Sequence, residues 1–249
     1  MCFSGYGRAT DVDLCIVTES HLNKLIPDAV INIEGYKLYR RDRDLANNDK
    51  RKGGGVAIYL RENLKVMSIK RDKNYEMMSI NILIPSGHNM LIIGLYHPPT
   101  FSYLEADLIE SITDITDKFL DCCPNGNVLC GGDLNHLNLD TLSIMSGLSA
   151  LVKFPNRGNA VLDNCLTNRP ELFSEPAPYK VLSKTDHIAV ILPPGFKLKP
   201  IRTKYTFRDY REHGEIKFGK MIEDQDWAHV AHTNDVNCAT DLLNETIHS

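Results

Sequence analysis

The 249-residue sequence lacks the features that would place it in several common classes of protein. It has no apolar run of the roughly 18 residues that a membrane-spanning helix needs, and no signal-peptide pattern opens it. Its formal net charge is −4, so no overall positive field favours nucleic acid. We therefore expect an intracellular protein of the nucleus or cytoplasm that has no membrane partner and is not secreted.

Familiar ligand-binding patterns of cysteine and glycine are also missing. The seven cysteines are odd in number and fit no zinc spacing. Cys15, Cys130 and Cys165 lie inside apolar runs, which favours buried free thiols and a reducing compartment. The triple glycine at 53–55 lacks the Lys-Ser/Thr of a Walker loop and precedes a strand-like run, which favours a hairpin over a phosphate cradle.

Positive charge is concentrated in two segments. Residues 40–52 hold six Lys/Arg against three acidic residues, and residues 195–220 hold eight against three. Each segment is interpreted either as a local basic face or as the solvated surface of a loop or linker, and the sequence leaves both open.

Short strand-like runs dominate the first two thirds of the chain. In 76–84, Met78, Ile80 and Ile82 alternate with Ser79 and Asn81, which predicts one face more buried than the other. The expected strands cover 12–18, 55–61, 64–70, 76–84, 90–96, 127–131, 151–154, 160–166, 179–182 and 187–192.

Helices are fewer. One apolar stripe predicts a helix over 103–121, with Ser102 and Glu105 as a capping box. A weaker helix is expected near 139–150, and two more near 208–223 and 236–248. The pattern predicts an α/β fold of two packed sheets flanked by helices over residues 11–193, followed by a basic linker and helical connector over 194–249.

Polar side chains follow several of the apolar runs. Asp133 and Asn135 come after Gly131-Gly132, where a carboxylate and an amide can hold a water molecule. Asp186-His187 precedes another run, where an imidazolium can donate to a phosphate oxygen. Both sets also suit ordinary turns, and the residues alone leave that alternative open.

Three further residues lie at strand ends or inside strands. A buried carboxylate at Asp163 needs a partner, either an imidazole N–H or the backbone. Glu19 can bind a divalent cation through oxygen or be a solvated loop acid. Tyr96 can donate to a phosphate oxygen or be a half-buried aromatic residue, whereas the adjacent His97 is expected to point away and be structural.

These motifs, in this order, resemble the endonuclease/exonuclease/phosphatase superfamily. The matching pieces are Thr18-Glu19-Ser20, Tyr96, Gly-Gly-Asp-Leu-Asn at 131–135, Leu-Asp-Asn at 162–164 and Thr-Asp-His at 185–187. The segments 35–43, 53–59 and 96–99 are similar to the apurinic-like endonuclease of non-LTR (LINE-type) retrotransposons. The tail, with Tyr210-Arg211 and Asp226-Trp227, resembles the connector that precedes a reverse transcriptase in such elements.

The resemblance implies a four-layered α/β sandwich and a Mg²⁺- or Mn²⁺-dependent attack of water on a DNA phosphodiester. Glu19 and Asp186 would serve the metal, with Asp186 assisting the metal or the leaving group. Asp133 and Asn135 would orient and deprotonate the water, Asp163 would set His187 on the phosphate, and Tyr96 would stabilise the transition state. DNA is the implied partner. A reverse transcriptase is expected downstream in an intact element but no polymerase motif is present here.

Two departures from the family pattern bear on activity. No apolar strand with a metal-site Asn precedes Glu19 within residues 1–10, so we expect the first strand to be missing through N-terminal truncation. Thr185 replaces the usual Ser but keeps the hydroxyl. The alternatives to a DNA endonuclease are an inactive retroelement fragment that retains the fold, and a phosphatase or phosphodiesterase of the same superfamily.

Overall fold

The computed structural model describes residues 2–3, 12–43, 53–179, 186–195 and 212–248. The chain forms two compact units, residues 1–198 and 199–249, and each is described by itself. The expected boundary near residue 193 stays a prediction.

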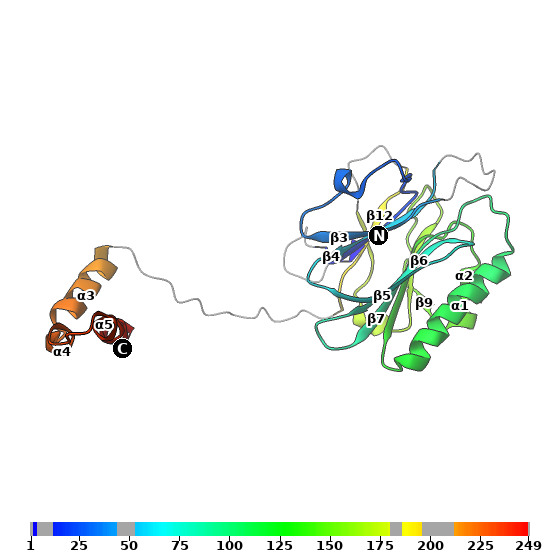
Figure 1. Ribbon diagram of the computed structural model, residues 1–249. Helices are drawn as coiled ribbons and strands as arrows, with labels where there is room; N and C mark the ends of the chain where they lie inside the picture. Colours follow the sequence, from blue (N-terminus) through cyan, green and yellow to red (C-terminus); the bar gives the residue numbers. More distant parts are fainter. Residues whose placement is uncertain (1, 4–11, 44–52, 180–185, 196–211, 249) are drawn as a thin grey trace. The chain divides into compact units, whose positions relative to one another are not determined.

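The first unit contains two six-stranded sheets, which Figure 1 shows face to face. The first sheet has the order β11-β12-β1-β2-β4-β3 and the second the order β5-β6-β7-β8-β10-β9. The strands of the first sheet are β1 (Cys2–Phe3), β2 (Leu14–Thr18), β3 (Tyr36–Arg41), β4 (Val56–Arg61), β11 (Ala177–Tyr179) and β12 (Ala189–Leu192). Those of the second are β5 (Lys65–Arg71), β6 (Glu76–Leu83), β7 (Asn89–Tyr96), β8 (Asn127–Asp133), β9 (Ser149–Ala150) and β10 (Asp163–Thr167).

The two-residue strand β1 corrects part of the expectation that the first strand is missing: a strand pairs ahead of β2, although residues 1–10 contain no Asn for a metal site. Cys2 and Phe3 pair antiparallel with β2 and parallel with β12, so two residues join the halves of the first sheet. A segment this short gives no periodic signal in the sequence. The strand is formed by backbone pairing with β2 on one side and β12 on the other, which satisfies its N–H and C=O groups. The rest of 1–11 lies outside the described residues.

The main core lies between the sheets. Ile58 and Leu60 of β4 and Met78 and Ile80 of β6 face one another across it, and all are almost fully buried. The alternation of β6 is confirmed, but its second face is buried as well, since Met77 belongs to a second core beneath the helices. A helix layer on the outer face explains why both faces of the central strands are covered.

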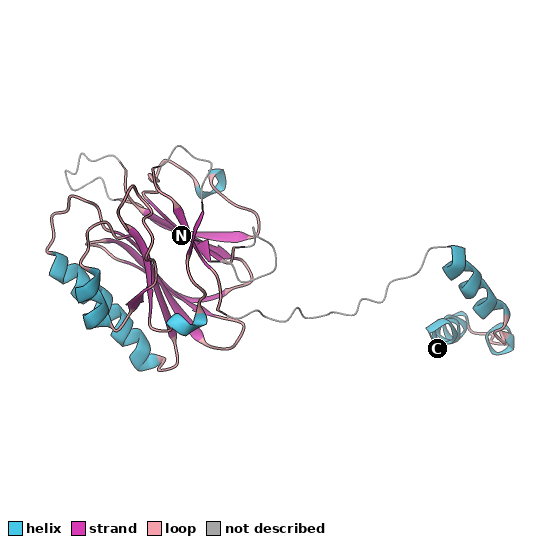
Figure 2. Ribbon diagram, turned by 180° about the vertical axis from the view of Figure 1, so that it is seen from behind, coloured by secondary structure: helices cyan, strands magenta, loops and turns pink. Residues whose placement is uncertain are grey.

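Two α-helices, α1 (Glu105–Cys122) and α2 (Leu139–Ser146), cover the outer face of the second sheet (Figure 2). In α1, Leu108 and Ile112 are buried against this sheet. The predicted capping box is wrong: the N-cap residue is Leu104 with no side-chain cap, and the Glu105 carboxylate instead accepts a hydrogen bond from the backbone N–H of Asn138, at 3.0 Å. This bond ties the start of α1 to the start of α2. The described part of unit 1 also has two short 3₁₀ helices, η1 (Asp28–Val30) and η2 (Pro170–Leu172).

The α/β class with two packed sheets flanked by helices is therefore confirmed. The sequence pattern does not reveal β3, whose Tyr36–Arg41 stretch mixes basic and aromatic residues and resembles a basic loop. It also predicts a strand at 151–154, where the structure has only the two-residue β9 just before it. Both errors are at sheet edges, where one unpaired side weakens the apolar pattern.

The second unit contains α3 (Glu212–Glu223), α4 (Ala228–Ala231) and α5 (Val236–His248). The expected helices near 208–223 and 236–248 are confirmed over the described residues, and α4 was not predicted. The indole of Trp227 donates to the carbonyl of Ile222 at 2.9 Å, and His229 Nε2 lies 3.0 Å from the Thr246 hydroxyl, which joins α4 to α5. No side chain in the described part of this unit is fully buried.

Two chain-wide expectations concern cysteine and the membrane. Cys130 and Cys165 are buried free thiols as expected, whereas Cys15 is half-buried. Across the described residues, none of the helices combines the length and apolarity that crossing a bilayer requires.

Candidate active site

Strand pairing brings the predicted carboxylates to one edge of the second sheet. Asp133 ends β8 in register with Tyr96, the last residue of the parallel strand β7. On the other side, Asp133 pairs with Asp163, the first residue of the antiparallel strand β10. The end of β7, the end of β8 and the start of β10 therefore share one edge, and Glu19 follows directly on β2 of the facing sheet.

Gly132 allows β7 and β8 to approach at this edge. Its φ is +149°, and a Cβ added there would lie 1.9 Å from the carbonyl oxygen of Leu95. Only glycine fits this position, and the residue that follows it is Asp133. The second glycine of the Gly-Gly motif is therefore required by the close approach of the backbone rather than by a turn.

Asp133 is almost completely buried, with 2% of its surface exposed. Burial, followed by the charge of Asp163, raises the pKa of its carboxyl to about 6, while His187 and a hydrogen bond from the backbone N–H of Asn135 act in the opposite direction. That N–H lies 3.2 Å from Asp133 Oδ1. The carboxylate is thus desolvated and surrounded by other ionisable groups.

Asn135 adopts a left-handed backbone conformation, with φ of +45°. Its side-chain N–H donates to the carbonyl of His97 at 2.7 Å, so it joins the loop after β8 to the loop after β7. The His97 ring points away, as expected. Its Nδ1 lies 2.8 Å from the Tyr103 hydroxyl, the ring contacts that of Phe101 at a tilt of 43°, and burial lowers the pKa of the imidazole.

Asp163 and His187 form a hydrogen-bonded pair. Asp163 Oδ2 lies 2.7 Å from His187 Nδ1, and both side chains are about four-fifths buried. Asn156 holds both segments: its side-chain oxygen accepts from the backbone N–H groups of Leu162 and Asp163, and its carbonyl accepts from the backbone N–H of Ile188, next to His187. The pair sets the orientation of the imidazole ring through Nδ1, as in other Asp–His dyads.

Glu19 and Tyr96 form a second pair. The Tyr96 hydroxyl donates to Glu19 Oε1 at 2.5 Å. Burial, with a further contribution from this hydrogen bond, raises the pKa of the phenol well above its usual value, so it stays protonated. Glu19 has φ of +48°, and its other oxygen, Oε2, lies 3.6 Å from His21 Nε2. A non-glycine residue in this conformation at a strand end is typical of functional loops.

Asp186 is exposed and pairs with a residue that the sequence did not single out. Its Oδ2 accepts a hydrogen bond from Arg157 Nε at 2.8 Å, and this contact lowers the pKa of the Asp186 carboxyl. Arg157 forms a β-bridge with His187, and the charges of Asp133 and Glu19 raise its pKa further. Arg157 therefore lies within electrostatic reach of the carboxylates. The predicted metal role of Asp186 stays a prediction, and Thr185 lies outside the described residues.

No family model and no curated protein matches this chain by sequence, but solved structures match its fold. Truncated TDP2 of Caenorhabditis elegans aligns with a TM-score of 0.54 at 15% identity, over 72% of this chain and 82% of its own. The catalytic domain of Xenopus laevis APE2 aligns with 0.51 at 12%, over 76% and 86%. An endonuclease/exonuclease/phosphatase family protein of Bacteroides thetaiotaomicron aligns with 0.52 at 12%, over 72% and 82%.

The chain has the endonuclease/exonuclease/phosphatase fold. At these identities the likeness concerns the fold, and the chemistry must be argued from the residues of this chain. The structure brings six of the seven predicted residues into three contacts at one edge: Asp163 with His187, Glu19 with Tyr96, and Asp133 with Asn135. Asp186 joins them through Arg157.

In the described part of the chain, no three His, Cys, Asp or Glu side chains converge closely enough to enclose a metal ion by themselves. Of the carboxylates at the edge, Asp163 is paired with His187, which leaves Glu19 and Asp133, on facing sheets, as the carboxylates for a cation. A cation there would be bound by few protein ligands.

Sequence reasoning missed Asn156, Arg157 and Arg43. The guanidinium of Arg43 lies 5.8 Å from the centre of the Tyr96 ring and pairs with Glu76 at 2.6 Å. A lone Arg or Asn in a loop gives no periodic signal. The only hint in the sequence is the Asn156-Arg157-Gly158 turn shortly before the Leu-Asp-Asn motif.

Proposed function

We propose that the chain is a Mg²⁺- or Mn²⁺-dependent DNA endonuclease, derived from a LINE-type retrotransposon, that nicks a phosphodiester by attack of water. The observation that carries the proposal is the convergence of the Asp163–His187 pair, the Glu19–Tyr96 pair and Asp133 at one edge of the sheets. This set provides a base, an imidazole donor and hard oxygen ligands, as metal-assisted phosphate hydrolysis requires.

Asp133 is the base in this proposal. A carboxyl with a pKa of about 6 is largely ionised at neutral pH yet accepts a proton more readily than an ordinary aspartate. The side-chain N–H of Asn135 donates to the His97 carbonyl. We therefore expect its side-chain oxygen to accept a hydrogen bond from the attacking water and so orient it. The proton of the water passes to an Asp133 carboxylate oxygen as the new P–O bond forms. The P–O bond to one sugar oxygen breaks in the same step, and that leaving oxygen takes a proton from solvent.

His187 and Tyr96 bind the phosphate. Since Asp163 binds His187 at Nδ1, we expect the other edge of the imidazole ring to face a non-bridging oxygen of the phosphate. The Tyr96 phenol is protonated and donates to Glu19 in this structure. It would transfer that hydrogen bond to a phosphate oxygen that carries more charge in the transition state.

The residues present fit a divalent cation held mainly by its substrate. Glu19 is half-exposed, offers a hard carboxylate and is fixed in place by Tyr96. Mg²⁺ keeps several waters and is commonly bound by one or two carboxylates together with phosphate oxygens. When bound, the cation would neutralise charge on the phosphate. We expected Asp186 to bind the metal. It could do so only after its hydrogen bond with Arg157 is broken.

That pairing favours a second candidate, a catalytically inactive protein that retains the fold and binds DNA. An Asp186 carboxylate that is paired with Arg157 stabilises the loop and is not available to bind a cation. In this case the chain would not supply the DNA nick that precedes reverse transcription in an intact element.

Conversion of supercoiled plasmid to the nicked form, with Mg²⁺ and with excess chelator, separates the candidates. We expect nicking with Mg²⁺ and none with chelator. Binding of plasmid without nicking in either condition would support the inactive candidate. Turnover of a soluble phosphomonoester without any action on DNA would contradict both and indicate a phosphatase.

A further inference from the structure

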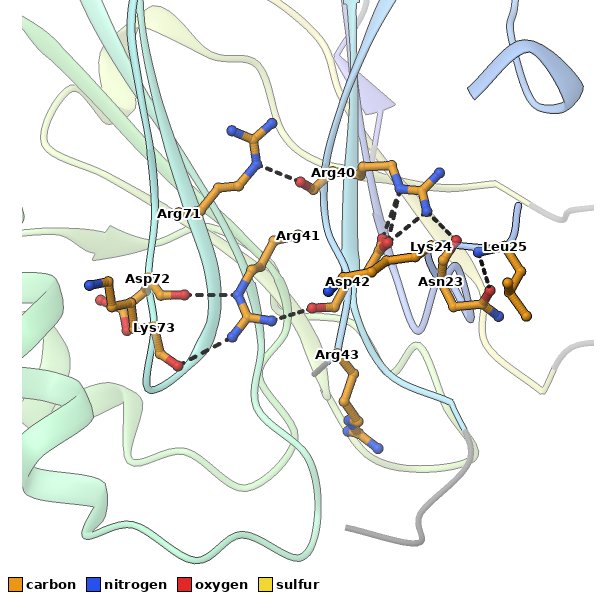
Figure 3. A pocket seen from close by; sticks show the side chains of 10 residues that line it. All are labelled: Asn23, Lys24, Leu25, Arg40, Arg41, Asp42, Arg43, Arg71, Asp72 and Lys73. Carbon is orange, nitrogen blue, oxygen red and sulfur yellow. Dashed lines mark hydrogen bonds and ion pairs between the residues drawn. The ribbon is translucent and has the colours of Figure 1, made fainter. Parts of the chain in front are cut away.

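A basic cavity of about 780 Å³ opens beside the site (Figure 3). Three chain segments line it: 23–25, which follow Glu19; 40–43, at the end of β3; and 71–73, at the turn between β5 and β6. It lies where the edge strand of the first sheet meets the edge strand of the second. Its lining contains six Lys/Arg and two Asp: Lys24, Arg40, Arg41, Arg43, Arg71, Lys73, Asp42 and Asp72.

Reciprocal arginine contacts build the wall of the cavity. Arg71 of β5 donates from Nε to the carbonyl of Arg40 at 2.7 Å. Arg41 of β3 donates in return to the carbonyl of Asp72 at 2.8 Å, and also to that of Asp42. Figure 3 shows the Arg71–Arg40 and Arg41–Asp72 bonds crossing between the two sheets, with the terminal nitrogens of Arg71 directed away from Arg40. The guanidinium groups are therefore held in fixed positions by backbone oxygens.

The positive charges differ in how far they are neutralised. Arg40 pairs with Asp28 and Asp42, and Arg43 pairs with Glu76. Over the described residues, by contrast, Arg41 and Arg71 contact only backbone carbonyls, and Lys24 and Lys73 are exposed without an ion pair. Asp72 is satisfied by the backbone N–H groups of Asn74 and Tyr75 rather than by a cation. Four positive charges thus remain for an anion.

Arg43 lines the cavity and also contacts the candidate active site. The guanidinium of this residue lies over the Tyr96 ring and is fixed by Glu76, which also accepts a hydrogen bond from the backbone N–H of Gly55. Tyr96 in turn donates to Glu19, four residues before Asn23. A bound strand that leaves Tyr96 would pass Arg43 and reach those four positive charges.

We propose that this cavity binds the phosphate backbone of duplex DNA on one side of the nicked bond. The four cations are spread over three segments rather than directed at one point, which suits an extended polyanion better than a single phosphate ion. The contacts are to phosphates and carry no base readout, so the cavity adds affinity and register without sequence preference. The inference rests on the proposed function for its choice of DNA.

The test is the salt dependence of binding, measured by fluorescence anisotropy with a labelled duplex in the presence of chelator, so that no cleavage occurs. The variant is the double substitution Lys24→Gln/Lys73→Gln, since both lysines are exposed and neither side chain makes a described contact; the hydrogen bond from Arg41 reaches the backbone carbonyl of Lys73 and survives the change. The matched control is Lys37→Gln/Lys65→Gln, on exposed residues near the start of β3 and at the start of β5, whose side chains likewise make no described contact.

Removal of one phosphate-binding cation should reduce the slope of log K against log salt by about 0.9, so the double variant should show a slope smaller by about 2. The control should keep the wild-type slope, and circular dichroism should show both variants folded. An unchanged slope in the Lys24/Lys73 variant would overturn the inference.

The same proteins distinguish this failure from failure of the proposed function. If the wild type nicks plasmid but the cavity variant binds with the wild-type slope, the cavity is not a DNA site and the endonuclease remains. If the slope falls as expected but the wild type nicks nothing, the cavity binds DNA and the endonuclease is wrong.

Discussion

At the scale of single residues, Asp133 lies in surroundings that oppose its ionisation. Burial and the neighbouring charge of Asp163 both raise its pKa, to about 6. Because a base acts only when deprotonated, its titration should appear in the rate. The position of this group links the packing of the sheet edge to the proposed chemistry.

We predict that the nicking rate at saturating Mg²⁺ rises about tenfold per pH unit below pH 6 and levels off above it. The rate rises with pH because Asp133 is active when ionised, and with a pKa raised to about 6 its ionised fraction becomes the major form above that pH. Single-turnover rates on a duplex oligonucleotide, with circular dichroism at each pH, provide the measurement. A rate that is flat between pH 4.5 and 7 would contradict the assignment.

The Asp163–His187 pair should behave as one unit. We expect His187→Ala to lower the nicking rate by about 10²–10⁴, Asp163→Asn to lower it to a similar extent, and the double variant to lose little more. The control is His88→Ala, an exposed histidine just before β7, at the strand end opposite Tyr96. Additive losses in the double variant would show that Asp163 does not act through His187.

The site residues that can be predicted from the sequence are those next to apolar strands. Asp133, Asp163 and Tyr96 end or begin apolar strands, so the chain pattern itself marks them. His187 is marked by its motif. Arg157 and Asn156 lie in a loop without periodicity, and only the folded chain brings them to His187 and Asp163. Loop residues are therefore the part of the site that local sequence could not supply.

At the scale of elements, the central strands were predictable and the edges were not. Strands β6, β7 and β8 read as apolar runs because sheet and helix cover both their faces. β3 is an edge strand, and its Arg41 donates a hydrogen bond to the turn between β5 and β6. Because such contacts require basic side chains, the sequence of β3 resembles that of a basic loop. β1 has two residues and depends on its neighbours. Tertiary pairing, rather than local propensity, decides such elements.

Gly132→Ala should destabilise the fold more than an ordinary glycine substitution. The added methyl group would overlap the Leu95 carbonyl, and β7 and β8 cannot separate without loss of the register between Tyr96 and Asp133. We expect a loss of more than about 3 kcal/mol in the free energy of unfolding, measured with urea.

Gly147→Ala is the matched control for that experiment. Gly147 also has positive φ, +68°, but a Cβ there would meet nothing within 4 Å. It should cost only about 1 kcal/mol, the usual penalty of left-handed backbone. Equal losses at the two positions would mean that the close approach of β7 and β8 carries no special cost.

At the scale of the whole molecule, the two units differ in how much they bury. The first has two extensive cores, whereas the second is short and has no fully buried side chain in its described part. Ile216, Phe218 and Val236 are all exposed on its helices. So small a unit gains little hydrophobic stabilisation by itself.

The chain has a single tryptophan, Trp227, and it lies in the second unit. Tryptophan fluorescence therefore reports the second unit, whereas circular dichroism near 218 nm (about the β-sheet minimum) is dominated by the first. We predict that the fluorescence transition in urea precedes the dichroism transition by at least about 1 M. Coincident transitions would show that the two units unfold together.

The central claim is that the edge built by β7, β8 and β10 hydrolyses DNA, with Asp133 as the base. Its most direct test is the initial rate of plasmid nicking in Mg²⁺ at pH 7.5 by Asp133→Asn beside Asp140→Asn, an equal change at an exposed position in α2. We predict that Asp133→Asn loses at least about 10²-fold while Asp140→Asn keeps the wild-type rate. Nicking by Asp133→Asn at the wild-type rate would contradict the account.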